Sequence, residues 1–361
     1  MSLPRPTLLA GVARSQRGPR TVQLGADPDR AVVIDLPDPR AARVLDLLDG
    51  SRPDREVVQS AAASGLSAGE TRALIDTLIA AGYVQPAASL AAPIPSLAGE
   101  AAALALQTRS RIGQPPDSTA ARILRRRAAS RVLLTGSGRL AAPIAVALAA
   151  AGVGQIHPEL SGTVAAEEVT GGPLTAADAG RPRAAAVVSA LARTALAVHT
   201  GDLRRGPVTL VIQLGHDQPV ALLAAAHLSR RRPHLAVGLR EGVPAVGPFV
   251  PATGAPCLNC IDLHRRDRDP GWTGFLPATA EPCAVATVLA ATALATAESL
   301  AVIDGDIPQT RGVTIEVHSP GVLRRRTWHP HPSCRCARVR RSPPARPRLP
   351  VLPPTRTDSS R

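Results

Sequence analysis

The stretch Arg131-Val-Leu-Leu-Thr-Gly-Ser-Gly-Arg-Leu-Ala141 sets the architecture of most of this chain. Residues of strand character lead into a glycine turn, Gly136 to Gly138, and an Ala-rich helix follows. Backbone N–H groups at such a turn can hold a phosphate, and a Cβ at either glycine would block its approach. The third position of the usual motif is Ala141, however, and Ile156-His-Pro-Glu159 is irregular rather than a strand with an acidic end. The turn alone therefore fits a nucleotide site and a purely structural turn equally well.

Predicted strands and Ala-rich helices alternate around this turn. The strands are expected at 131–135, 208–214 and 235–239, and the helices at 141–151, 183–197 and 219–229. This alternation indicates a mainly parallel sheet with helices on both faces. The longest apolar runs, 141–156 and 284–303, contain Gly, Pro or Glu, so we expect buried helices rather than membrane spans.

The first ninety residues predict a small domain of strands and three helices. The strands are expected at 21–24 and 31–34, and the helices from Asp38 to Gly50, at 54–64 and from Ser67 to Ala81. Ser67 and Glu70 form a capping box at the start of the third helix. A hairpin with three helices is typical of a winged helix. An Ala-, Pro- and Arg-rich connector with one helix at 97–105 follows it.

A winged helix suggests DNA binding, but the third helix carries Arg72 beside Glu70 and Asp76, which is the wrong charge balance for phosphate contacts. We therefore expect no DNA partner. Two alternatives remain open for this domain, which are peptide capture by strand addition at an exposed edge and a scaffolding role without a ligand.

The composition also argues against nucleic acid. Apolar residues make up 45% of the 361 residues but aromatic residues only 1%, and all 42 basic residues are Arg. Of the formal charge of +14, eleven Arg against one acidic residue, Asp358, lie between Arg324 and the C-terminus, which leaves about +4 elsewhere. Without aromatic residues to stack bases, this basic end is predicted to be a solvated tail. Residues 1–15 lack a secretory signal, so we expect a cytoplasmic protein without a membrane partner.

Four of the five cysteines form two close pairs. Cys257-Leu-Asn-Cys260 and Cys334-Arg-Cys336 are separated by 73 residues. Together they can surround one tetrahedral ion, which predicts a structural Zn²⁺ site; unmetallated core thiols and a redox pair are the alternatives. Nearby histidines are further candidate ligands or packing residues: His264, His329 and His331.

The fifth cysteine, Cys283, follows Glu281-Pro282 at the start of a long predicted helix. The helix dipole there would lower the pKa of its thiol and favour a nucleophile. The sequence places no partner base beside it, so a buried small side chain is the better interpretation and a nucleophile is the alternative.

These motifs together resemble a known superfamily. The glycine turn, Leu148–Gly154, Asp178–Arg183 and the split cysteine set resemble the ThiF/MoeB-like adenylating fold. Further segments are more similar to the ThiF-like partner of YcaO cyclodehydratases in actinobacteria, a leader peptide-binding protein: Pro233–Val237, Val246–Val250, Pro256–His264, Arg268–Pro270 and Trp272. The resemblance covers nearly the whole chain, because that family begins with a winged-helix peptide-recognition element, which residues 20–86 resemble.

The resemblance implies an α/β fold, in which a winged-helix peptide-recognition domain precedes a Rossmann-like ThiF-type domain with a zinc knuckle. We expect these units at 1–90 and 131–337, with a linker at 91–130 and a disordered basic tail at 338–361.

Departures from the family pattern limit what this likeness implies about chemistry. Active members have an acidic strand end, an Arg-Gln pair after it, and an Asp that helps to hold magnesium. This chain has Ile156-His-Pro-Glu159 and Gly215-His-Asp217 in the corresponding places. Only Gly136, Gly138 and Arg183 match, so we expect a vestigial nucleotide site, weak or absent ATP binding, and no catalytic residue.

The leading hypothesis is a non-catalytic partner that binds the leader of a precursor peptide and presents its Cys, Ser or Thr residues to a YcaO cyclodehydratase. A second is an adenylating enzyme that activates a peptide or carrier C-terminus, with Gly136, Gly138, Arg183 and Asp217 as its remnants. A third is a redox or thiol-transfer protein that uses Cys283. Members of the superfamily commonly form homodimers, which we expect here as well.

Overall fold

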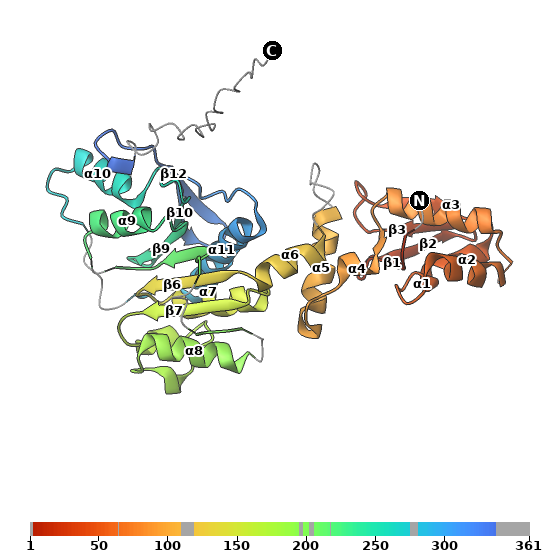
Figure 1. Ribbon diagram of the computed structural model, residues 1–361, viewed down its shortest axis with the longest axis horizontal. Helices are drawn as coiled ribbons and strands as arrows, with labels where there is room; N and C mark the ends of the chain where they lie inside the picture. The colour runs from red at the N-terminus through yellow and green to blue at the C-terminus, as the bar shows by residue number, and fades with distance from the viewer. Residues whose placement is uncertain are drawn as a thin grey trace, which may run out of the picture.

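A computed structural model gives the structure of the chain. It describes residues 3–63, 65–109, 119–194, 198–201, 206–216, 218–274 and 281–336. A small amino-terminal body and a larger body built on a wide sheet are joined by helices (Figure 1). The predicted tail at 338–361 lies outside the described residues, and the unit boundaries remain a prediction.

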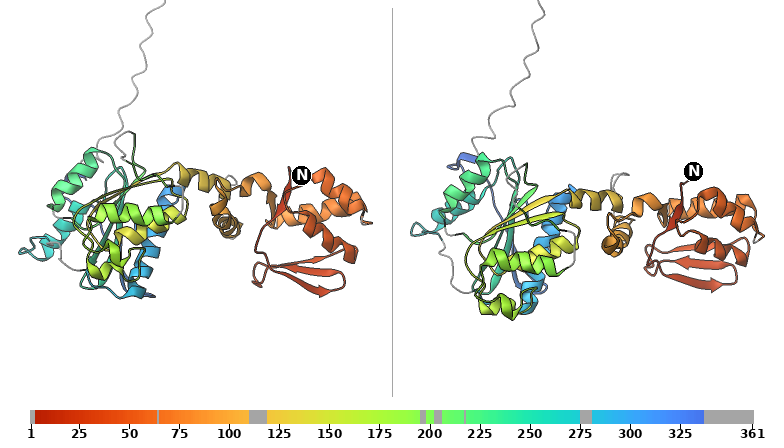
Figure 2. Two further views of the ribbon diagram at one scale, coloured as in Figure 1. Left: turned by 90° about the horizontal axis from the view of Figure 1, so that it is seen from below. Right: turned by 60° about the horizontal axis from the view of Figure 1, so that its bottom comes forward.

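The amino-terminal body has the layers of a winged helix, with a three-stranded antiparallel sheet beneath its helices (Figure 2). The sheet has the order β2-β3-β4, and β1 pairs separately with β5. The strands are β1 (Pro6–Leu8), β2 (Arg14–Gly18), β3 (Thr21–Leu24), β4 (Val32–Asp35) and β5 (Val84–Pro86). The helices are η1 (Pro39–Arg43), α1 (Val44–Leu47), α2 (Asp54–Ala63) and α3 (Ala68–Ala80).

Local signals account for most of this body. The capping box is confirmed, because Ser67 Oγ accepts a bond from the Glu70 backbone N–H at 3.1 Å and the Glu70 carboxylate accepts one from the Ser67 N–H at 2.9 Å. The helix predicted from Asp38 to Gly50 is shorter, a 3₁₀ turn followed by α1. Strand β2 was not predicted, because its residues are polar and mostly exposed and show no apolar alternation.

The described residues of the connector form helices, one of which is attached to the larger body. Its helices are α4 (Ala87–Leu90), η2 (Pro95–Leu97), α5 (Ala98–Arg109) and α6 (Ala120–Ala128), which confirm the helix predicted at 97–105 and extend it. The buried guanidinium of Arg127 on α6 lies 2.8 Å from the carboxylate of Glu100 on α5 and 2.7 Å from that of Asp304. One ion pair therefore joins α6 to α5, and the other attaches α6 to the larger body at Asp304.

A seven-stranded sheet forms the larger body, with the order β12-β11-β10-β9-β8-β6-β7. The strands β7, β6, β8 and β9 are parallel, and the remaining pairs are antiparallel. The strands are β6 (Arg131–Gly136), β7 (Gln155–Leu160), β8 (Leu210–Gln213), β9 (His234–Arg240), β10 (Val243–Val250), β11 (Val313–Ser319) and β12 (Val322–Thr327). The helical segments are α7 (Ala141–Ala150), η3 (Ala166–Val169), η4 (Ala176–Asp178), α8 (Arg183–Arg193), α9 (Val220–Ser229), α10 (Leu258–Arg268) and α11 (Val285–Asp304).

Helices cover both faces of this sheet, as predicted. Val132 and Leu134 of β6 pack in the main apolar cluster with α7, α8 and α11, whereas Leu133 between them packs with Val211 on the opposite face. The α/β fold class, with its winged helix and Rossmann-like unit, is therefore confirmed.

Strand β7 corrects one expectation. The sequence predicted an irregular segment at 156–159, yet β7 runs parallel to β6 in register through all six residues. Pro158 cannot donate a ladder hydrogen bond, but β7 is the last strand of the sheet, where one side of the strand needs no partner.

Helix α11 is the one helix of the described residues that is long and apolar enough to cross a membrane by length and composition. Half of its most apolar window is buried inside the fold, where the helix packs against α7, β10 and β11. The prediction of a buried helix is confirmed.

Candidate functional site

The glycine turn lies where the order of the parallel strands reverses. The chain passes from β6 outward to β7 and then returns to β8 on the other side of β6, so a crevice forms at the carboxyl ends of β6 and β8. A cavity of about 330 Å³ opens there, with Ser137, Gly215, His216 and Glu281 among its lining residues. This position is where open α/β sheets bind their ligands.

Gly136 is required by packing against the chain itself. Its φ is +97°, and a Cβ at this position would lie 2.1 Å from the carbonyl oxygen of Gly215. The adjacent Ser137 N–H donates to the same oxygen at 2.9 Å. The first glycine therefore fixes the contact between the ends of two strands, and a ligand is not needed to explain it.

Gly138 faces a different neighbour. Its φ is +148°, and an added Cβ would lie 3.4 Å from a carboxylate oxygen of Glu281. The backbone N–H of Arg139 donates to that carboxylate at 2.6 Å. No sequence pattern indicated this contact, because Glu281 lies 142 residues further along the chain.

Arg183 is brought to the glycine turn, as the resemblance implied, but its donors are engaged by the protein. The guanidinium is paired with the Glu168 carboxylate and donates to the carbonyl oxygens of Thr163 at 2.7 Å and Ser161 at 3.3 Å. It also reaches the Gly138 oxygen at 3.4 Å. Its side chain is 10% exposed, so it braces the loop after β7 against the turn.

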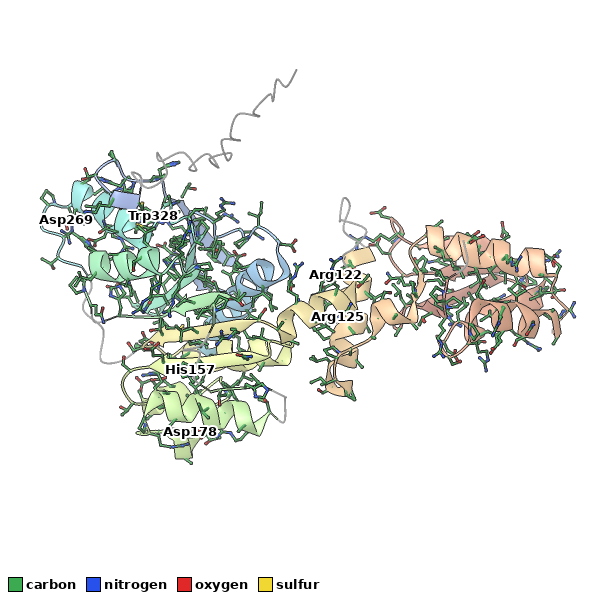
Figure 3. The ribbon with its side chains drawn as sticks, in the orientation of Figure 1. Arg122, Arg125, His157, Asp178, Asp269 and Trp328 are labelled. Carbon is green, nitrogen blue, oxygen red and sulfur yellow. The ribbon has the colours of Figure 1, made fainter. Side chains whose placement is uncertain are left out.

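Asp178, from the same resembling segment, has a structural position at the edge of the larger body beside α8 (Figure 3). Its carboxylate accepts bonds from Arg181 at 2.6 Å and Arg193 at 2.9 Å. The backbone hydrogen bond from Thr175, together with the Thr175 hydroxyl and Arg193, lowers the pKa of Asp178 to about 2 against the opposing effect of burial. Asp217, the remaining residue of the adenylation hypothesis, lies outside the described residues.

Cys283 does not have the surroundings of a nucleophile. It is half buried just before α11, and its Sγ lies 3.3 Å from the carbonyl oxygen of Gly242. Burial raises the pKa of this thiol, so the lowering expected from the helix dipole is wrong. The position fits the interpretation as a small packing side chain.

The four remaining cysteines meet in one buried cluster. Sγ separations are 3.8 Å for Cys257–Cys260, 3.5 Å for Cys257–Cys334 and 3.3 Å for Cys260–Cys336. Four sulfurs about 2.3 Å from a central ion would stand about 3.8 Å apart in a tetrahedron. All four atoms lie within 4.8 Å of one another, so the cluster could hold a metal ion.

The chemistry of the donors fits Zn²⁺, which four thiolates bind in closed structural sites. Hydrogen bonds to Cys260 and Cys336, followed by burial, raise the pKa of Cys257. The hydrogen bonds with Cys257 and Cys336 instead lower the pKa of Cys260, so the four thiols do not ionise alike. A divalent cation would stabilise all four as thiolates. Trp328 packs in the same apolar cluster, at the α10 end of the larger body (Figure 3).

Two of the three neighbouring histidines, His264 and His331, contact groups other than the cysteines. His264 Nε2 lies 3.0 Å from the His329 carbonyl oxygen. His331 Nε2 lies 2.8 Å from the Asp267 carboxylate, while its Nδ1 accepts a bond from the Ser333 N–H at 3.1 Å. These contacts attach the loop that carries Cys334 to helix α10. The histidines therefore support the cysteine cluster without completing it.

The winged helix offers two sheet edges of different character. The edge strand β2 presents polar side chains, which are mostly exposed. The opposite edge strand, β4, carries Val33, whose side chain is 49% exposed. Arg55 on α2 and Arg72 on α3 are exposed cations of the same body.

Part of this body matches a known family. Residues 39–87 match the IclR helix-turn-helix domain. The match agrees with the winged helix and does not decide DNA binding in either direction. No curated protein matches the chain in sequence.

Solved structures show the same arrangement over most of the chain. The microcin C7 biosynthetic enzyme MccB in complex with N-formylated MccA is 12% identical, with a TM-score of 0.59 over 92% of this chain and 99% of MccB. MccB of E. coli with ATP is 14% identical, with a TM-score of 0.60 and the same coverage. PaaA is 16% identical, with a TM-score of 0.58 over 88% of this chain and 98% of PaaA. At these identities the likeness establishes the fold alone. The chain thus has the ThiF-like fold of these structures, with a winged helix at its amino-terminal end.

Proposed function

We propose that this chain is a non-catalytic partner that binds the leader of a ribosomal precursor peptide and presents the peptide to a YcaO cyclodehydratase. The observation that carries the proposal is the engagement of Arg183. Its guanidinium donates to the Glu168 carboxylate and to backbone oxygens of Ser161, Thr163 and Gly138. The side chain that should hold nucleotide phosphate therefore serves the scaffold.

The winged helix is the proposed leader site. Strand β4 is an edge strand with an exposed apolar side chain, so an extended peptide can add to it through main-chain hydrogen bonds while Val33 contacts a side chain of the peptide. Arg55 and Arg72 suit acidic residues in a leader and would act mainly on the encounter rate and its salt dependence. The fold also occurs in MccB structures that contain MccA.

A second candidate is an adenylating enzyme that acts on a peptide or carrier C-terminus. Its support is the glycine turn at the reversal of strand order, together with the MccB structure that contains ATP. This candidate requires Arg183 and the turn to accept phosphate after their present contacts break.

Three accompanying features belong to the same proposal. The cysteine cluster holds one structural Zn²⁺ through Cys257, Cys260, Cys334 and Cys336, the protein acts in the cytoplasm, and it assembles as a homodimer. The geometry of the four thiols supports the zinc site, and the family resemblance supports the homodimer.

Two assays separate the candidates. Pyrophosphate exchange into ATP should be absent for the isolated chain, and clear exchange would establish the adenylating enzyme instead. In parallel, fluorescence anisotropy with a labelled cognate leader should show saturable binding.

A Val33→Asp variant should weaken that binding about tenfold, which corresponds to about 1.4 kcal/mol. A matched Ser15→Asp variant on β2 should leave it unchanged. Equal affinities of the two variants would move the peptide site away from β4.

A further inference from the structure

One charged side chain at the glycine turn has no part in the proposed function. Glu281 immediately precedes the segment that leads into α11, and one carboxylate oxygen accepts a 2.6 Å hydrogen bond from the Arg139 N–H. A Cβ on Gly138 would lie 3.4 Å from this oxygen and 3.6 Å from the other. The carboxylate therefore covers the glycine turn directly, just before the ten-residue helix α7.

The backbone around Glu281 is attached to the same turn. The guanidinium of Arg139 donates to the carbonyl oxygens of Cys283 at 3.3 Å and Thr170 at 2.9 Å, with a longer contact of 3.5 Å to that of Glu281. Arg139 is only 4% exposed, so these bonds are shielded from water. The carboxylate is thus held over the turn by both its side chain and its main chain.

The charges around Glu281 resemble those of a phosphate site. Burial raises the pKa of this carboxyl group, and Glu168 raises it further, whereas the Arg139 N–H and the charges of Arg183 and Arg139 oppose the shift. The N-terminal end of α7 adds partial positive charge. A turn of this kind receives an external phosphate in other proteins. Here a group of the chain itself takes that position, and a phosphate at the same N–H would meet a like charge.

We propose that Glu281 is an internal substitute for phosphate, which keeps an otherwise competent anion site at Gly138 and Arg139 closed to the diphosphate or triphosphate group of a nucleotide. This inference goes beyond leader binding, which we place on β4 of the other body. Either proposal can therefore fail without the other.

The test is calorimetry of the full-length chain with inorganic pyrophosphate and with ATP and magnesium at low salt. The wild type should bind neither at millimolar concentration. Glu281→Ala removes the occupant and should bind pyrophosphate at least about tenfold more tightly than the wild type, or about 1.4 kcal/mol. Glu281→Gln keeps the shape and loses the charge, so a smaller gain is expected.

Glu241→Gln is the matched control, because Glu241 lines the same cavity and has the same charge. This control should behave as the wild type does. Pyrophosphate affinities of Glu281→Ala and Glu281→Gln no better than that of the control would overturn the proposal, as would micromolar ATP binding by the wild type. Should the Ala variant unfold, the Gln variant alone decides the outcome. Leader affinity, measured on the same samples, should stay constant.

Discussion

The cysteine cluster and the glycine turn both unite residues that are far apart in the chain, yet they differ in what those residues do for each other. At the turn, Arg183 meets Glu168 and carbonyl oxygens, and Arg139 meets Glu281, so the polar groups satisfy one another. At the cluster, the contacts of the four buried thiols are weak: they are to one another and, for Cys334, also to Asn259 Nδ2 at 3.4 Å. Polar residues that the fold brings together therefore indicate a ligand only where they do not already satisfy one another's hydrogen bonds and charges.

The largest expected effect tests the cluster. The wild-type chain should contain about one equivalent of zinc. Cys334→Ser should contain none, because the closed four-thiolate site loses a ligand. We also expect the melting temperature to fall by more than about 5 °C. Metal analysis and thermal unfolding give the two values.

Cys283→Ser, outside the cluster, is the control and should retain full zinc content. A normal zinc content in Cys334→Ser would show that the cysteine cluster does not hold the metal, and the contrast with the glycine turn would be lost.

The next effect concerns the brace at the turn. Arg183→Ala leaves the Glu168 carboxylate buried without its partner and should lower the free energy of unfolding by about 3–5 kcal/mol. Adding Glu168→Gln to this variant should recover part of the loss, since the uncompensated charge disappears. Urea unfolding measures both variants. A mild effect of Arg183→Ala on stability would indicate that this residue is kept for a ligand rather than for the fold.

A smaller effect distinguishes packing from backbone strain at the turn. Gly136→Ala combines a positive φ with a contact of 2.1 Å to Gly215, so a loss of about 2–4 kcal/mol is expected. Gly180 also has a positive φ, +79°, but open space around its missing side chain. Gly180→Ala should therefore cost only about 1 kcal/mol. Comparable denaturation midpoints for the two variants would contradict the packing role of Gly136.

The smallest effect lies between the two regions, at a buried histidine pair. His227 and His234 are stacked with ring centroids 4.2 Å apart, and His227 Nε2 lies 3.0 Å from Gln213 Oε1. Burial, and for His227 also the neighbouring His234, lowers the pKa of His227 to about 3 and that of His234 to about 4.

The unfolded chain binds protons near pH 6.5, whereas the folded pair does not. Stability is therefore complete above pH 6.5 and is lost as the pH falls toward 4, by at most about 1.4 kcal/mol per pH unit for each histidine. Urea midpoints at pH 7.5 and 5 should show a shallower acid loss for His227→Leu than for the exposed control His318→Gln. An unchanged slope in His227→Leu would remove the pair as the cause.

The sequence predicted those features whose causes are local. The capping box at Ser67 and the run from Arg131 into the glycine turn carry their own structure, and thiol pairs limit the chemistry of the cluster. Strand β2 escaped prediction because its pairing with β3, rather than apolar alternation, makes it a strand. Pro158 led to the wrong prediction of an irregular segment. A strand can contain this proline only because β7 is at the edge, and the position of β7 is a property of the whole sheet.

The candidate site divides in the same way. Gly136, Gly138 and Arg183 could be named from the sequence, and the structure brings them together. Their present partners could not be named, because Glu281 and Gly215 reach the turn across 142 and 79 residues respectively, and such tertiary contacts leave no periodic signal.

The buried Arg127 has a consequence for how any ligand of the winged helix would be delivered. A flexible tether of the connector's length would let that ligand sample a large volume, so its effective concentration at the larger body would fall with tether length. The ion pairs to Glu100 and Asp304, and the packing of Leu9 against the connector helices, leave helices α5 and α6 little conformational entropy to lose. The distance from the winged helix to the active site of a partner enzyme would then have to be bridged by the bound peptide itself, at about 3.3 Å per extended residue.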